Sequence, residues 1–170
     1  MERPHLIEAT KDQLDRVLAF FPRADAKASV VLAVDTGMLA ILAANAPSLQ
    51  TFHWPVLLGL IPTFCIAISL WHLYKGAFPS LKGGQSSLIY FREIAKRTEH
   101  RFIEEFMGQK EDDYIKDMLG QVWRNSEILK EKFDHLSRAF NWLALAILPW
   151  AVVLAFFVTQ YGSGQGVLIK

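Results

Sequence analysis

Two long apolar runs, joined by a short link without charge, dominate the hydrophobic pattern of this chain. Residues 28–46 are interrupted only by Asp35, and residues 54–74 contain no Asp, Glu, Lys or Arg. At about 1.5 Å rise per residue, each run matches the roughly 30 Å hydrocarbon core of a bilayer. The pattern predicts a transmembrane hairpin over residues 28–75. A hairpin buried in a soluble protein is the alternative, and two adjacent uncharged runs of this length argue against it.

A third apolar run covers residues 140–160 and predicts a third transmembrane helix over 140–161. The stretch before it, residues 76–139, carries two amphipathic patterns at helical spacing, one over 86–107 and one from about 113, with Gly108 between them. Two such helices joined by a short polar turn are expected to form an antiparallel hairpin. No helix breaker separates Leu136 from Phe140, so the second of these helices is predicted to be continuous with the third span.

The chain begins with an amphipathic pattern over residues 5–21, which Pro22 is expected to end. The complete prediction is an all-α membrane protein with three transmembrane helices and a cytosolic antiparallel helical hairpin. Its parts are a cytosolic N-terminal amphipathic helix (1–27), a transmembrane hairpin (28–75), a cytosolic helical hairpin (76–139), a third span (140–161) and a flexible glycine-rich tail (162–170).

The distribution of charge gives this arrangement an orientation. Apolar residues make up 52% of the chain and charged residues 21%, so the charges must be segregated from the apolar runs. Of the 18 Lys and Arg residues, five lie in 1–27, none between the first two spans, twelve in 75–139 and one at the C-terminus. The positive-inside rule therefore predicts that the N-terminus and residues 76–139 are cytoplasmic. A net charge of +1 gives no reason to expect nucleic acid as a partner.

Signals for catalysis or metal binding are weak. The chain has no HExxH, GxSxG or Walker motif, and its five histidines show no ligand spacing. The single cysteine, Cys65, lies within the second span and fits a small packing residue. We therefore expect no enzyme activity, no catalytic residue, no metal site and no cofactor.

Candidate ligand-binding residues appear once depth in the membrane is considered. In an antiparallel hairpin, the start of the first helix, the end of the second and the beginning of the first span lie at one juxtamembrane level. Residues 83–87 after Lys82 are expected to present free backbone N–H groups to an anion such as phosphate, and an aromatic ring nearby can stack on a base. An ordinary helix cap with snorkelling lysines is the alternative. The converging residues are Asp25, Lys27, Ser86, Ser87, Tyr90, Phe91, Lys130 and Lys132, with His135 beside them.

A second set of candidates lies inside the spans and is predicted to serve in gating. Asp35 lies at a depth where a charge is costly and by default functional; the alternative is a protonated or snorkelling carboxyl paired with Asn141, His72 or Ser69. The other three, Gly37, Pro62 and Pro149, each fall near the middle of a span, where proline kinks a helix. Aromatic residues gather toward the span ends, with Trp150 as the exception.

Three stretches resemble the transmembrane effectors of the Pycsar antiphage systems, the PycTM-like proteins. Residues 24–29, Ala-Asp-Ala-Lys-Ala-Ser, are similar to the D-x-K-A-S motif before the family's first span. Residues 87–95, Ser-Leu-Ile-Tyr-Phe-Arg-Glu-Ile-Ala, are similar to its S-x-x-Y/F-F-x-x-I-A helix start, and residues 128–132, Ile-Leu-Lys-Glu-Lys, precede the last span. The resemblance covers most of residues 22–158. Asp35-Thr36-Gly37 departs from the Asn-Gly expected there.

The resemblance implies an antiphage defence effector of the bacterial inner membrane. Such a protein is activated by a cyclic pyrimidine mononucleotide, cUMP or cCMP, made by a partner cyclase, and then impairs membrane integrity. No recognisable cyclic-nucleotide-binding domain is present, so the ligand site must be built from the helices described above, with a homo-oligomer as a further expectation. A constitutive membrane-anchored scaffold that binds a protein partner is the competing hypothesis, because an amphipathic hairpin would suffice for it.

Overall fold

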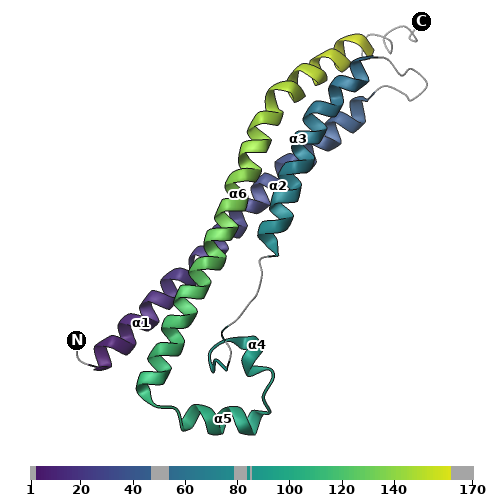
Figure 1. The fold of residues 1–170 in the computed structure, drawn as a ribbon. Coiled ribbons are helices and arrows are strands. Elements are labelled where there is room, and N and C mark those ends of the chain that lie inside the picture. The colour runs from purple at the N-terminus through teal and green to yellow at the C-terminus, as the bar shows by residue number, and fades with distance from the viewer. Residues whose placement is uncertain (1–2, 47–53, 79–83, 85, 162–170) are drawn as a thin grey trace, which may run out of the picture. The chain divides into compact units, whose positions relative to one another are not determined.

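The computed structural model describes residues 3–46, 54–78, 84 and 86–161 (Figure 1), and this part of the chain contains helices and no strand. The elements are α1 (Arg3–Leu18), α2 (Phe20–Asn45), α3 (Trp54–Ala77), α4 (Phe91–Ile94), α5 (Glu99–Met107) and α6 (Glu111–Tyr161). The predicted all-α class is therefore confirmed. The link 47–53 and the tail 162–170 lie outside the described residues.

The helices form two compact units. A polar unit comprises Met1–Ala24 and Pro79–Lys132, and a spanning unit comprises Asp25–Phe78 and Phe133–Lys170. Two helices belong to both units, because α2 passes from the first to the second near Asp25 and α6 does so near Phe133.

Three helical stretches are long and apolar enough to cross a membrane. They are His5–Asn45, which takes in most of α1 and all of α2, Leu57–Ala77 in α3, and Glu111–Thr159 in α6. Only 22 to 28% of the most apolar window of each is buried within the protein. The outward faces carry large apolar side chains such as Phe64, which is 64% exposed, and Leu148, which is 74% exposed. Apolar side chains on the outside are the arrangement expected of helices whose solvent is lipid, so the three predicted spans are confirmed in length and composition.

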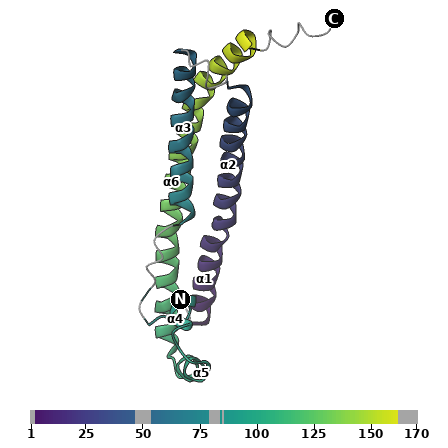
Figure 2. The same ribbon diagram turned by 90° about the vertical axis from the view of Figure 1, so that its right-hand side faces the viewer.

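Within the spanning unit, α2, α3 and the C-terminal part of α6 run side by side (Figures 1 and 2). Their buried positions recur in steps of four and three, the spacing of a coiled-coil seam. Small side chains at this seam allow the backbones to approach closely. The seam consists of Val31, Asp35, Met38 and Leu42 from α2; Pro62, Ile66, Ser69 and Leu73 from α3; and Ala139, Leu143, Ala146, Val153 and Phe157 from α6.

The N-terminal helix does not end at Pro22, as the sequence pattern predicted. The interruption falls earlier, between Leu18 and Phe20, and Pro22 lies in the first turn of α2. Pro22 has no N–H to donate to the carbonyl of Leu18, four residues before it, and proline is well tolerated in a first turn. The Ala19 N–H still donates to Asp15 O at 2.9 Å, so only a short break separates α1 from α2.

The predicted helix over residues 86–107 is also wrong in its first half. Only α4, four residues long, and α5 are helical there. The Ser87 hydroxyl accepts from the Ile89 and Tyr90 N–H groups at 3.1 and 3.0 Å, and such local bonds compete with helix formation. Thr98 caps the start of α5 by accepting from the Arg101 N–H, and α5 ends at Met107 before Gly108, as predicted.

Helix α6 runs for 51 residues without interruption, which confirms the predicted continuity between the second amphipathic helix and the third span. It begins with three acidic residues in its first turn, Glu111, Asp112 and Asp113, where negative charge complements the helix dipole. Its C-terminal part curves (Figure 1), and Pro149 inside it removes one backbone hydrogen bond.

Candidate functional site

Asp35 is the polar centre of the spanning unit. Its side chain is fully buried between the spans, and Oδ2 lies 2.6 Å from the Ser69 hydroxyl of α3. The same hydroxyl lies 3.0 Å from the Ala139 carbonyl oxygen of α6. One chain of contacts therefore connects all three spans. Of the three partners that the sequence left open, the structure selects Ser69.

The number of hydrogens available to these three groups indicates whether the Asp35 carboxyl is protonated. A serine hydroxyl carries one hydrogen, and both the Ala139 carbonyl and an ionised Asp35 carboxylate only accept. A proton on Asp35 Oδ2 resolves the conflict, because the carboxyl then donates to Ser69 and Ser69 donates to Ala139. Asp35 Oδ1 has no hydrogen-bond partner within the described residues, which also disfavours a buried full charge. The geometry therefore fits a neutral carboxylic acid.

Two further polar contacts join the spans. The Trp150 indole N–H donates to the Met38 carbonyl oxygen at 3.0 Å, linking α6 to α2. The Nδ1 atoms of His72 and His135 lie 3.2 Å apart, linking α3 to α6. One of these nitrogens must donate and the other must accept, so the two rings cannot both carry a proton there.

The other three gating candidates differ in their surroundings. Pro62 is fully buried inside α3, at the seam described above, and Pro149 lies inside α6. Gly37 is exposed on α2, and a Cβ built on it would meet no atom within 4 Å. A methyl group therefore fits at Gly37, whereas Pro62 and Pro149 are positions at which the helix itself is weakened.

In the polar unit, the segment around Ser87 is held by a dense set of internal hydrogen bonds. Ser87 is buried, and its hydroxyl accepts from the Gln121 side chain of α6 at 3.1 Å in addition to the two backbone N–H groups described above. The Leu88 N–H donates to Asp117 Oδ2 at 2.8 Å. The Ser86 N–H donates to Glu93 Oε2 at 3.2 Å, with Ser86 in the left-handed region at φ 63°.

These bonds bear on the expectation that residues 83–87 present free backbone N–H groups to an anion, because one of those groups, the Ser86 N–H, already has an acceptor. The N–H groups of Ser86, Leu88, Ile89 and Tyr90 are not free to bind an anion, because each has an acceptor within the protein. Two of these acceptors are carboxylates, which take the place that an anion would occupy. Gly83 and Gln85 lie outside the described residues.

Arg97 also holds the segment around Ser87 in place. Its guanidinium donates to the carbonyl oxygens of Ser86, Ser87 and Glu93 at 2.6 to 3.2 Å and to Glu105 Oε2 at 2.7 Å. Hydrogen bonds from Arg101 and Arg97 lower the pKa of the Glu105 carboxyl below its ordinary value. Arg97 thus satisfies carbonyl groups that no helix satisfies, and it fixes the turn between α4 and α5.

Side chains able to contact a ligand remain on the surface of the polar unit. Phe91 is 62% exposed and lies edge-on to the half-buried Tyr90, with 5.1 Å between ring centroids. Lys130 is exposed on α6, and the Lys132 amine lies 5.6 Å from the centre of the Phe21 ring. Six of the eight predicted ligand-binding residues, Ser86, Ser87, Tyr90, Phe91, Lys130 and Lys132, belong to this unit.

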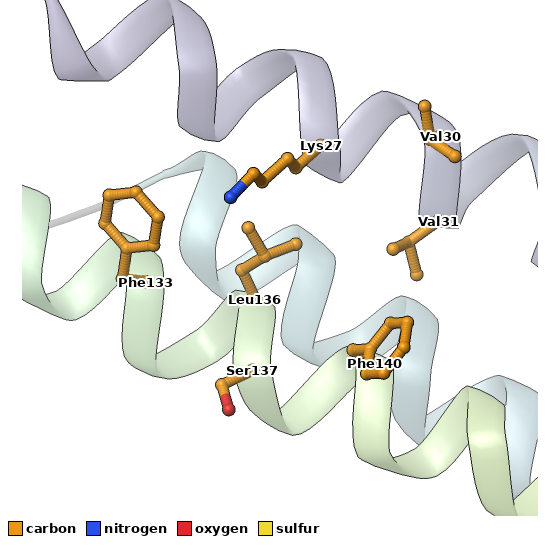
Figure 3. A pocket seen from close by; sticks show the side chains of 7 residues that line it. All are labelled: Lys27, Val30, Val31, Phe133, Leu136, Ser137 and Phe140. Carbon is orange, nitrogen blue, oxygen red and sulfur yellow. The ribbon is translucent and has the colours of Figure 1, made fainter.

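The other two, Asp25 and Lys27, belong to the spanning unit. The Asp25 carbonyl accepts from the Ser29 hydroxyl at 2.9 Å. Lys27 lines a cavity of about 420 Å³ between α2 and α6 (Figure 3), with its amine 5.9 Å from the centre of the Phe133 ring. The remaining lining residues are Val30, Val31, Leu136, Ser137 and Phe140. The surroundings of Lys27 are therefore mainly apolar.

A second cavity of about 380 Å³ lies elsewhere in the spanning unit. Its lining comes from all three spans and contains no charged side chain: Leu39, Leu42, Ala43, Ala46, Gly59, Leu60, Thr63 and Phe157. The two cavities are thus similar in size but differ in the presence of a cation.

Comparison with known proteins explains this combination of helices. The family described as Pycsar effector protein domain matches residues 9–159, which include all three spans and most of the polar unit. The chain belongs to the Pycsar effector family. Its three long apolar helices are those of a membrane protein.

A curated relative of this Pycsar effector is the Pycsar effector protein GmPycTM of Gulbenkiania mobilis. The two are 26% identical over an alignment of 99 residues that covers 54% of this chain and 50% of the relative. The chain thus spans about half the length of the curated relative that it matches. No solved structure gives a significant match.

Sequence reasoning missed several residues that organise this Pycsar effector. Arg97, Asp117 and Gln121 fix the segment around Ser87, and their only signal was a charged or amide side chain within a predicted amphipathic helix. Trp150 did give a signal, since it departs from the pattern of aromatic residues at span ends. The His72–His135 contact depends on two helices meeting 63 residues apart in the chain, and spacing alone does not reveal it.

Proposed function

We propose that this Pycsar effector is activated by a cyclic pyrimidine mononucleotide, cUMP or cCMP made by a partner cyclase, and then impairs the integrity of the bacterial inner membrane. The proposed role is that of an antiphage defence effector, which family membership supports. The observation that carries the proposed mechanism is the continuity of α6, which bears Lys130 and Lys132 in the polar unit and the seam residues Ala139 and Leu143 in the spanning unit. A ligand that moves the first part of this helix acts on an element that also packs in the membrane.

The proposed nucleotide site lies in the polar unit. The exposed Phe91 ring offers a surface for stacking a pyrimidine base, with Tyr90 beside it. The N–H groups of Ser86, Leu88, Ile89 and Tyr90 already have acceptors, so we propose that side-chain cations bind the phosphate, with Lys130 and Lys132 as the candidates. Ser86 adds an unfavourable backbone conformation at φ 63°, of the kind that concentrates at ligand-binding and switch segments. Asp25 and Lys27 are not required by this form of the proposal.

Calorimetric titration of the full chain in nanodiscs with cUMP and with cCMP tests the proposal directly. We expect one of the two nucleotides to bind, and Lys132→Ala to weaken that binding about tenfold or more through loss of a charge-assisted contact. The matched control is Lys116→Ala, which removes an exposed cation of the same unit that pairs with Asp113 in α6. Absence of binding by either nucleotide, or equal affinity in the two variants, would contradict the proposed site.

The membrane step is proposed to begin at the contact of Asp35 with Ser69 and Ala139. This contact is small and joins all three spans, so a modest displacement of α6 breaks it. Pro62 and Pro149 mark positions where α3 and α6 deform at low cost, and Gly37 lies on α2 two residues after Asp35. We propose an orientation with the N-terminus and residues 76–139 in the cytoplasm, a homo-oligomer as the active form, and no catalytic step. Nucleotide-dependent release of dye from liposomes measures this activity.

One observation favours a second candidate function, that of a constitutive scaffold for a protein partner. Large apolar side chains are exposed on the polar unit, including Met107 at 80% and Trp123 at 61%. On each of α5 and α6 they lie four residues apart, Ile103 with Met107 and Leu119 with Trp123, and therefore share a helix face. A scaffold would bind its partner without nucleotide and would cause no leakage, and Met107→Ser with Trp123→Ser would abolish that binding.

A further inference from the structure

The cavity beside Lys27 is lined almost entirely by apolar side chains from two helices that enter the membrane. Of its lining residues, Val31 is buried, while Val30 is 64% exposed and Phe140 is 59% exposed. Its volume of about 420 Å³ is within the usual range for ligand sites, roughly 300–1,000 Å³. An open apolar cavity on a membrane-facing surface is accessible to acyl chains.

Lys27 gives one end of this cavity a positive charge. Figure 3 shows its side chain reaching toward Phe133 and Leu136, while the Ser137 hydroxyl points away from it. No carboxylate pairs with the Lys27 amine in the part of the chain that the structure describes. Lys27 is also the last charged residue before the apolar run 28–46, interrupted only by Asp35. Its amine therefore lies at the level where lipid phosphates meet the hydrocarbon.

We propose that this cavity binds an anionic glycerophospholipid, with the phosphate against Lys27 and an acyl chain along Val30, Val31 and Phe140. A nucleotide fits the lining poorly, because its ribose hydroxyls and base need several polar partners and the cavity offers one cation. The inference does not depend on the proposed nucleotide activation, since it involves a different unit and a different ligand. The bound lipid packs between α2 and α6, so it becomes part of the assembly that the spans form.

Native mass spectrometry of the full chain tests the site. Delipidated protein is mixed with equal amounts of phosphatidylglycerol and phosphatidylcholine that have identical acyl chains. We expect one retained lipid and about a fivefold preference for phosphatidylglycerol, the effect typical of one lysine near a membrane surface. Lys27→Gln should retain lipid without preference. Val30→Trp should lose the retained lipid, because Val30 lines the cavity and its exposed position accepts a larger side chain without disturbing the core.

Lys75→Gln is the matched control, since Lys75 is also a lysine at the same end of the spans and lies 5.1 Å from an aromatic ring, that of Trp71, but does not line the cavity. It should behave like the unmodified chain. The second cavity is lined by no cation, so lipid bound there should show no preference between the two headgroups. Glycerol 3-phosphate at millimolar concentration should not displace the lipid, because it lacks the acyl chain.

Four outcomes would overturn the assignment. They are a wild-type chain without headgroup preference, equal loss of preference in Lys27→Gln and Lys75→Gln, unchanged lipid retention in Val30→Trp, and displacement of the lipid by glycerol 3-phosphate alone. Displacement by cUMP or cCMP, combined with loss of nucleotide binding in Val30→Trp, would assign the cavity to the nucleotide. Nucleotide titration of the same variants is measured separately, so failure of the lipid site is distinguishable from failure of the proposed activation.

Discussion

At the scale of single residues, Asp35 shows how position decides chemistry. A carboxylate in the middle of a span is expensive, yet the contact with Ser69 and Ala139 needs a group that donates. A neutral acid meets both demands. Asp35 therefore acts as a hydrogen-bond donor between helices, and its capacity to ionise becomes relevant only if the spans separate and water reaches it.

This assignment predicts different consequences for two substitutions. Asp35→Asn keeps a donor at the same position and should leave the thermal stability of the full chain nearly unchanged. Asp35→Ala leaves the Ser69 hydroxyl with one partner fewer and opens space at the seam, so we expect a loss of about 1–3 kcal/mol. Thermal unfolding in detergent, monitored by circular dichroism, measures both. If Asp35→Asn is as destabilising as Asp35→Ala, Asp35 is ionised and the neutral-acid assignment is wrong.

At the scale of elements, the turn between α4 and α5 depends on charge rather than on apolar burial. Neither α4 nor α5 contains a buried residue, and Arg97 with Glu105 holds the connection. Helix α6 is the opposite case, because its amphipathic and apolar parts are separately stabilised and joined by an uninterrupted backbone. The turn between α4 and α5 should therefore respond to pH, and α6 should respond to substitutions that change the stiffness of the helix.

The response to pH follows from the lowered pKa of Glu105. An ionised Glu105 stabilises the folded chain fully above the unfolded value of 4.5, and that contribution is lost as pH falls through the lower folded pKa. Glu105→Gln should therefore lower the unfolding temperature at pH 6, and its difference from the unmodified chain should close below pH 4.5. Glu104→Gln, on an exposed neighbour, is the control. A difference that stays constant between pH 6 and pH 3 would show that the Glu105 charge is not responsible.

The stiffness of α6 is tested by replacing Ser137 and Arg138 with glycine. Both residues are exposed, so the register of Ala139 at the seam is preserved, and each glycine costs about 1 kcal/mol in helix propensity. We expect this variant to bind nucleotide like the unmodified chain but to lose nucleotide-dependent liposome leakage. Ser137→Ala with Arg138→Ala is the control for loss of the side chains. Leakage at the original nucleotide concentration would show that coupling runs through α2 and α3.

At the scale of the whole molecule, the distribution of basic residues predicts the direction of the chain in the membrane. Cysteines at Ser48 and at Lys110, in a Cys65→Ser background, should react with an impermeant maleimide from opposite sides of the inner membrane. We expect Ser48→Cys to react in intact spheroplasts and Lys110→Cys only after the membrane is opened. Reaction of both from the same side would contradict the three-span topology.

The hydrophobic pattern by itself determined the class of this protein, the number of its spans and the continuity of α6, because runs of about twenty apolar residues have few alternatives. It failed where short polar side chains compete with the backbone, as Ser87 does before α4, and where proline shifts a break by one turn, as Pro22 does. Only the tertiary structure decided that Ser69 is the partner of Asp35 and that Lys27 lines an apolar cavity. It also decided that carboxylates accept hydrogen bonds from the N–H groups of Ser86 and Leu88. Each of these depends on which faces of distant helices meet, and a periodic pattern specifies a buried face without specifying its neighbour.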